Sequence, residues 1–334
     1  MPANMRDVAA LAGVSQRTVS NVVNNYVHVK PETRRKVLDA IEQLRYRPNI
    51  LAQRLRQGRT GLVALAVPEI AAPYFAELAD HVQRLAQQRG VTLLIDQTGG
   101  DRERERLVLQ GYQTHVIDGL ILSPLSIDAE DLADHQLDFP VVLLGESIAG
   151  GPYLHVSVDN VAAARMATNH LIETGRRRIA AIGAPRDTSL IGPAARRIAG
   201  FGEATEAAGL RSDLRYTPEA WTRREGYRIG QQIIETGADV DSVFCFNDLL
   251  ALGAMKAFAD LGVRIPEEIA VVGWDDIEEA AFSSPGLTSI APNKEEIART
   301  AVDGILARLA GDPDGVGEVT ASHALVTRRS SIIS

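Results

Sequence analysis

The chain has 334 residues, which is too many for one ordinary hydrophobic core and predicts two or three domains. Apolar residues make up 45% of it, enough for sizeable cores, but no apolar run approaches the roughly 20 residues that a membrane span requires. The net charge of −8 hides an asymmetry, because residues 1–60 contain 11 Lys and Arg against 4 Asp and Glu. This basic segment predicts a polyanionic partner, although basic surface helices without such a partner are also common.

The first residues lack a charged stretch followed by an apolar run, so we expect no secretion signal and a cytoplasmic location. The single cysteine, Cys245, cannot form an internal disulfide, which suits a reducing compartment. It lies in the strand-like run "SVFCFND", and this setting favours a buried core residue over a catalytic nucleophile.

Three short helices are predicted in the first 47 residues. Asn4 can cap the first, with Asp7 in its first turn and Val8 and Leu11 on its inner face. Gly13 allows a tight turn. Ser15 can cap a second helix, which turns three valines inward (Val19, Val22 and Val23) and leaves four polar residues outside (Gln16, Arg17, Ser20 and Asn21). Pro31 and Glu32 can begin a third helix. Its buried stripe would consist of Val37, Leu38, Ile41 and Leu44.

This arrangement is the helix-turn-helix pattern, in which the second helix enters the major groove of DNA. Gln can pair with adenine and Arg with guanine through two hydrogen bonds each. A plain helical hairpin with a solvated polar face is the alternative. The glycine at the turn, the caps and the positive charge favour DNA binding.

The stretches "DVAALAGVSQRTVSNVVNN" and "KPETRRKVLDAIEQLRYRPNILAQRLRQGRT" resemble the start of lactose-repressor (LacI/GalR) family transcriptional regulators from about Met5 to Thr60. The resemblance implies that Gln16, Arg17 and Asn21 read bases. It implies phosphate contacts for a further group: Ser15, Thr18, Ser20, Asn24, His28 and Tyr46.

By the same resemblance, residues 48–60 are a hinge helix and linker that joins the headpiece, residues 1–47, to the rest. Leu51 and Leu55 share a helix face, and in the family the leucine that Leu55 matches wedges into the minor groove, with Ala52 beside it. A leucine pair at this spacing is also common in ordinary cores. The resemblance and the basic neighbours favour the wedge.

From Gly61 onward, short apolar runs alternate with amphipathic helices, which predicts parallel sheets covered by helices. Two such series in succession predict two lobes. This region is similar to the periplasmic-binding-protein-like effector domain of the same family, in which the chain crosses between lobes three times. We therefore expect an α/β effector-binding and dimerisation domain over 61–334, with lobe 1 at about 61–159 and 291–320 and lobe 2 at about 160–290 and 321–334.

A ligand should lie between the lobes, at the carboxyl ends of the strands. The resemblance places six residues there: Tyr74, Phe75, Arg197, Trp221, Asn247 and Asp275. Phe75 can equally begin a helix and pack inward, and Asp159 and Asn160 can be ligand contacts or helix caps. Arg196 is expected to be solvated, and Asp276 is less favoured than Asp275 as a ligand contact.

The chain departs from the family pattern at three positions. Gly145 and Glu146 stand where many members have Asp, and Pro292 stands where many have Gln. Ile191 replaces the arginine that purine-binding members carry six residues before Arg197. These departures disfavour a purine and favour an uncharged or mildly polar sugar as the effector.

Enzymatic activity is not expected, because the sequence has no dinucleotide-binding glycine motif, phosphate loop, zinc spacing or esterase serine turn. We expect neither a cofactor nor a metal. A transport-type or chemoreceptor sugar-binding protein would share the effector fold, but not the basic helical head. The sequence thus predicts a cytoplasmic, nucleoid-associated homodimer that represses transcription from near-palindromic double-stranded DNA operators.

Overall fold

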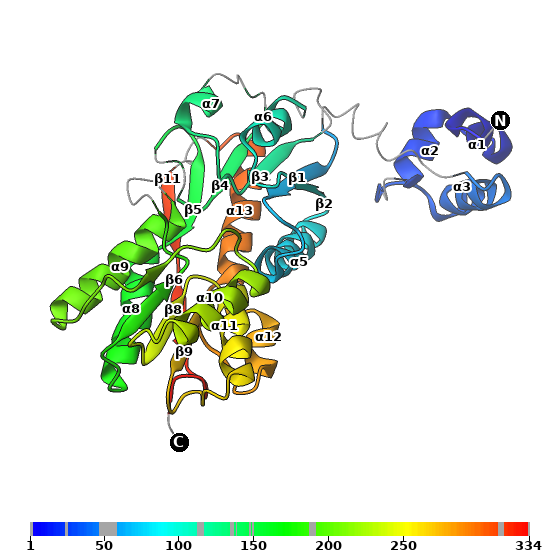
Figure 1. Ribbon diagram of the computed structural model, residues 1–334. Coiled ribbons are helices and arrows are strands. Elements are labelled where there is room, and N and C mark those ends of the chain that lie inside the picture. Colours follow the sequence, from blue (N-terminus) through cyan, green and yellow to red (C-terminus); the bar gives the residue numbers. More distant parts are fainter. Residues whose placement is uncertain are drawn as a thin grey trace. The chain divides into compact units, whose positions relative to one another are not determined.

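The computed structural model describes residues 3–23, 26–46, 59–111, 117–133, 137, 139–146, 148, 150–186, 192–312 and 317–332. It contains two compact units, Met1–Thr60 and Gly61–Ser334. Figure 1 shows the first unit as a group of helices and the second as sheets flanked by helices. No helix among the described residues combines the length and apolar character that a membrane span needs.

The first unit consists of α1 (Met5–Ala12), α2 (Gln16–Val23) and α3 (Pro31–Gln43). Asn4 caps α1 by accepting a hydrogen bond from the Arg6 amide at 2.8 Å, and Asp7 accepts one from the Asn4 amide at 2.9 Å. Gly13 ends α1 with a φ of 64°, a left-handed conformation that glycine adopts without strain. The caps and the turn therefore follow the sequence prediction.

The core of this unit is made of small residues that pack between the three helices. Its fully buried members are Val8, Val19 and Val37, each with 0% exposure. Two predicted core residues are outside it, since Leu11 is 50% and Leu38 is 51% exposed. Leu38 is one residue, or about 100°, beyond Val37 on the helix, and Ala40 takes the inward position instead.

The second unit contains two six-stranded sheets with the same strand order. The first sheet runs β11-β5-β4-β3-β1-β2 and the second β12-β10-β9-β8-β6-β7. The first comprises β1 (Leu62–Val67), β2 (Thr92–Gln97), β3 (Gly119–Leu122), β4 (Val141–Leu144), β5 (Leu154–Val158) and β11 (Gly317–Ala321). The second comprises β6 (Ile179–Ile182), β7 (Arg215–Tyr216), β8 (Ser242–Cys245), β9 (Ala270–Trp274), β10 (Thr288–Pro292) and β12 (His323–Val326).

Among the described residues, all strand pairings are parallel except that of β12 with β10, which is antiparallel. Central strands such as β3, β4 and β8 are buried along their whole length, as expected for parallel strands covered on both faces. The chain passes between the sheets after Val158, after Pro292 and after Ala321.

Helices join the strands and cover the sheets (Figure 1). They are α5 (Pro73–Gln88), α6 (Arg102–Gly111), α7 (Ala129–Ala133), α8 (Asn160–Glu173), α9 (Pro193–Ala207), α10 (Arg223–Glu235), α11 (Asp248–Asp260), α12 (Glu278–Phe282) and α13 (Lys294–Leu309). The last part of the chain adds α13 and three strands, because short segments on either side of α13 extend both sheets.

Candidate functional site

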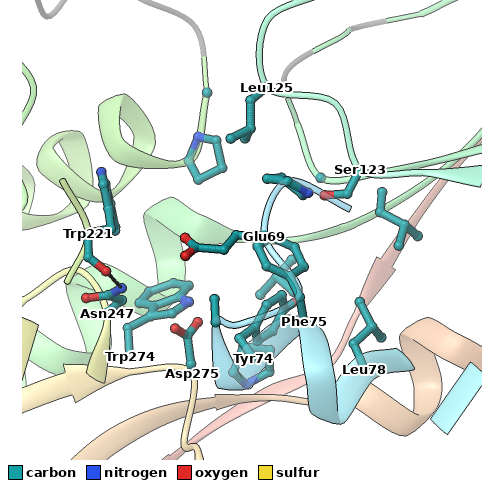
Figure 2. Close-up of a pocket in the computed structure, with 18 of the residues that line it drawn as sticks. Glu69, Tyr74, Phe75, Leu78, Ser123, Leu125, Trp221, Asn247, Trp274 and Asp275 are labelled. Atoms are coloured by element: carbon teal, nitrogen blue, oxygen red, sulfur yellow. Dashed lines mark hydrogen bonds between the residues drawn. The ribbon is translucent and has the colours of Figure 1, made fainter. Parts of the chain in front are cut away.

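A cavity of about 600 Å³ lies between the two lobes of the second unit (Figure 2). Residues that end or directly follow strands of both sheets line it, as the carboxyl ends of open α/β sheets would predict. All six residues that the resemblance assigned to the cleft line this cavity: Tyr74, Phe75, Arg197, Trp221, Asn247 and Asp275. These residues come from segments that are as much as 201 positions apart in the chain, from Tyr74 to Asp275.

Arg197, on α9, is the cation of the cavity wall. Its Nε donates to Asn160 Oδ1 at 2.7 Å, and its Nη1 donates to the carbonyl of Phe246. The guanidinium carbon lies 3.9 Å from the centre of the Trp274 ring, a cation–π distance. Burial lowers the pKa of Arg197 to about 10, against the opposing charge of Asp275, so the group stays protonated at neutral pH.

Asp275 follows β9 and has a φ of 108°, which is strained for a residue with a side chain. Burial raises the pKa of its carboxyl to about 7, while the charges of Arg197 and Lys294 oppose the rise and that of Glu77 adds to it. Near pH 7 the carboxyl is therefore about half ionised, and hydroxyl donors from a ligand would favour the ionised form.

Asp248 stabilises the strained turn at Asp275 through hydrogen bonds. The Asp248 carboxyl is fully buried and accepts hydrogen bonds from the Ile277 amide at 2.9 Å and from Ser289 Oγ at 2.6 Å. A side chain at position 273 would come within 2.1 Å of Asp248 Oδ1, so glycine is needed there. Asp276 is absent from the lining residues and instead forms an ion pair with Arg328 at 2.6 Å.

Four of the described aromatic residues line the cavity: Tyr74, Phe75, Trp221 and Trp274. Tyr74 and Phe75 contact each other edge to face, with ring centres 5.2 Å apart. Phe75 both lines the cavity and packs against the apolar core, so the two expectations for this residue are compatible. Trp221 is 39% exposed on the opposite lobe, which leaves its ring accessible to a ligand.

Three polar residues lie where the chain first passes between the lobes and at the start of α11: Asp159, Asn160 and Asn247. Some of them cap helices, and some line the cavity. Asp159 caps α8 by accepting from the Ala162 amide at 2.9 Å, whereas Asn160 lines the cavity and holds Arg197. Asn247 does both: its Oδ1 caps α11 at the Leu250 amide, and its Nδ2 donates to the Trp221 carbonyl at 3.3 Å.

In the first unit, the residues expected to contact DNA gather on and around α2. Gln16 and Arg17 are exposed, and Ser20 and Asn21 are half-buried. Ser15 Oγ accepts from the Thr18 amide at 3.1 Å, so it caps α2. His28 and Tyr46 lie on the loop before α3 and just after α3, respectively. Asn24, Ala52 and Leu55 lie outside the described residues.

Comparison with known proteins agrees with both units. Residues 4–49 match the bacterial regulatory proteins of the lacI family, and residues 168–331 match the periplasmic binding protein-like domain. The HTH-type transcriptional repressor PurR of Vibrio atlanticus (strain LGP32) is 31% identical to this chain. The match covers 99% of this chain and 98% of the PurR chain. The chain belongs to the lacI family.

Two solved structures resemble the whole LacI-family chain. The lac repressor dimer bound to operator and the anti-inducer ONPF has a TM-score of 0.88 at 26% identity, covering 100% of both chains. The complex of the transcriptional regulator CelR with cellobiose has a TM-score of 0.73 at 30% identity and covers 98% of this chain and 99% of its own. The protein is thus a DNA-binding transcriptional repressor of this family and not an enzyme.

Two of the three departures from the LacI-family pattern lie at the cavity, since Gly145 and Pro292 line it. Glu146, beside Gly145, accepts from Asn160 Nδ2 at 2.9 Å and pairs with Arg196 Nε at 3.1 Å. Arg196 was expected to be solvated. Its side chain is only half-exposed, because it forms an ion pair with Glu146 of the other lobe. Ile191 lies outside the described residues.

Sequence reasoning missed Trp274 and Glu69, which both line the cavity. Trp274 directly precedes Asp275 at the end of β9 and stacks on Arg197, so the strand-end position was a usable signal. Glu69 follows the first strand in "VPEI", the same kind of position. Among the described residues, no group of His, Cys, Asp and Glu is placed to hold a metal ion.

Proposed function

We propose that this repressor binds a sugar or sugar derivative in the cavity between its lobes and that this binding controls its affinity for operator DNA. The observation that carries the proposal is the convergence on one cavity of the six side chains that the family resemblance assigns to the cleft. Aromatic faces suit the C–H side of a sugar ring, and the carboxylate, amide and guanidinium groups suit its hydroxyls. The likeness to the CelR–cellobiose complex supports the same class of ligand.

The coupling acts through groups that join the lobes at the cavity. Glu146 of lobe 1 pairs with Arg196 of lobe 2, and Glu77 on α5 accepts from the Glu278 amide on α12 at 2.9 Å. A ligand that changes how the lobes close would alter these contacts. A coupling of about 1–3 kcal/mol between effector and operator is enough for regulation.

On DNA, two copies of the chain would read a near-palindromic operator, because a two-fold dimer matches two-fold DNA. Gln16, Arg17 and Asn21 would contact bases, while Ser15, Thr18, Ser20, Asn24, His28 and Tyr46 would contact phosphates. Leu55 and Ala52, in the hinge, would enter the minor groove. We place the dimer in the cytoplasm with its DNA, the headpiece spanning residues 1–47, the hinge 48–60 and the effector domain 61–334.

The test is a thermal-shift screen of sugars on the purified full chain, followed by operator binding with each sugar that raises the melting temperature. A ligand that binds only the folded state stabilises it by RT ln(1 + [L]/Kd), so the melting temperature rises with both ligand concentration and affinity. We expect at least one sugar to stabilise the protein and to change its operator affinity. A screen in which no sugar does either would contradict the proposal.

A further inference from the structure

The charged groups among the described lining residues of the cavity sum to a negative value near neutral pH. Its titratable lining residues are Glu69, Tyr74, Arg197 and Asp275. Arg197 is the only Lys or Arg among the described lining residues, and Asp275 is the carboxyl whose charge acts on it most strongly. Near pH 7 the half-ionised carboxyl of Asp275 offsets part of the charge of Arg197, so the carboxylate of Glu69 makes the sum of these charges negative.

Glu69 lies on the loop between β1 and α5, and its side chain is exposed. Figure 2 shows its carboxylate pointing into the cavity, toward the wall that holds Trp221 and Asn247. Within the described part of the chain, Glu69 has no ion pair with a Lys or Arg. Lys294, whose ammonium lies 5.9 Å from the centre of the Tyr74 ring, is bound to Glu77 at 2.7 Å and to the Asp276 carbonyl at 3.0 Å, so its charge is paired with another carboxylate.

Three kinds of sugar would meet this carboxylate differently. A phosphorylated or carboxylated sugar would be repelled by Glu69, and the single arginine is already held by Asn160 and Phe246. A neutral sugar would displace water from the charged carboxylate, which costs free energy, and would replace that water only with hydrogen bonds from its hydroxyls. A protonated amine would form a charge-assisted hydrogen bond with this carboxylate, and the indole of Trp221 in the same cavity offers a ring face that also attracts cations.

We propose that Glu69 determines effector specificity by selecting a sugar that carries a protonated amino group. This inference rests on the proposed function, since it assigns a chemical class to the ligand of the same cavity. Glu69 is a specificity residue of the first lobe, distinct from the six residues found from the sequence. Four of those six side chains already contact other protein groups: Arg197, Asn247, Tyr74 and Phe75.

The test is isothermal titration calorimetry of the full chain at neutral pH with matched sugars. Glucose, galactose and mannose are each compared with their 2-amino, 2-acetamido and 6-phosphate forms, and cellobiose is compared with the β-1,4-linked glucosamine disaccharide. We expect the amino form of the preferred sugar to bind about tenfold more tightly than its neutral parent. The acetamido form should lose this advantage, and the phosphate form should bind least.

The Glu69→Gln variant keeps the shape of the side chain and removes its charge. It should abolish the preference for the amine, so that the amino and neutral forms of the sugar bind with affinities within about twofold of each other. Glu206→Gln, which removes an exposed carboxylate on α9 away from the cavity, should keep the preference.

Neutral and amino sugars that bind equally to the wild type, or a preference for the amine that survives in Glu69→Gln, would overturn the inference and leave the proposed function standing. Failure of every sugar to bind would overturn both.

Discussion

The two units of this repressor place their recognition groups in opposite ways. In the headpiece, the candidate contacts Gln16 and Arg17 are neighbours on the exposed face of one short helix. In the effector domain, Arg197 and Asp275 come from distant segments and meet in a partly enclosed cavity. Burial shifts the pKa values of both of these residues, whereas the headpiece groups remain in water.

This difference predicts two kinds of energetics. Exposed headpiece groups should act through direct contacts with DNA whose strength falls as salt rises. Buried cavity groups should act on one another, so that removing one partner also leaves the other uncompensated. Mutations in one unit should therefore leave ligand binding by the other unit unchanged.

The largest effect is expected for Asp275→Ala. It removes the carboxylate that would accept ligand hydroxyls and leaves Arg197 without its main opposing charge, so effector affinity should fall about 100-fold or more. Calorimetry on the variant measures this loss. Asp80→Ala, on the exposed surface of α5, is the control and should bind like the wild type. An Asp275→Ala protein with normal effector affinity would remove this residue from the site.

Arg17→Ala should relax sequence preference at one operator position, because a two-bond contact between Arg and guanine gives about 1–3 kcal/mol of discrimination. The measurement is the affinity for operators changed at single base pairs, at fixed salt. Arg35→Ala removes a charge from the exposed surface of α3 and should weaken binding to all operators alike. Unchanged preference in Arg17→Ala would refute its role in reading a base, and effector affinity should be normal in both variants.

Trp221→Ala should weaken effector binding about tenfold, since it removes the exposed ring expected to face the sugar. Phe282→Ala is a suitable control because Phe282 is 81% exposed and does not line the cavity. Equal losses in the two variants would mean that the Trp221 ring has no specific contact with the ligand.

Effector affinity should also depend on pH. With a carboxyl pKa of about 7, Asp275 is protonated in more proteins as the pH falls, and ligand hydroxyls need the ionised form as their acceptor. Binding of an uncharged sugar should therefore be about fivefold weaker at pH 6 than at pH 7. Arg197, with a pKa of about 10, stays charged over this range. The Asp275→Asn variant should show no such dependence, and a flat wild-type profile would be inconsistent with this assignment.

The smallest effect is expected for Glu146→Gln, about twofold on effector affinity. The variant loses the charge that pairs with the half-exposed Arg196 but retains an acceptor for Asn160. Glu203→Gln breaks an ion pair with Arg165 inside one lobe and should have no effect. A large loss in Glu203→Gln and none in Glu146→Gln would show that contact between the lobes is not the relevant feature.

The same contrast explains what the sequence could and could not predict. The caps at Asn4 and Ser15 and the turn at Gly13 depend on neighbours within a few residues, so local pattern was sufficient. The exposure of Leu11 and Leu38 depends on how the helices cross, and there the prediction was wrong.

In the effector domain, alternating runs identified the two lobes, and family resemblance placed six residues at the cavity. Glu69 and Trp274 were missed because neither carries a local signal beyond its place at a strand end. The turn at Asp275 was equally hidden, since its strain is maintained by Asp248, which is 27 positions earlier in the sequence.

The most direct test of control by the cavity is operator affinity measured with and without a saturating sugar identified by the thermal-shift screen. Fluorescence anisotropy with a labelled operator should show a change of about fivefold or more in the wild type. The Asp275→Ala protein should bind the operator as tightly as the wild type without sugar and should not respond to it. A wild type whose operator affinity is the same with the cavity saturated, or an Asp275→Ala protein that responds normally, would contradict the account.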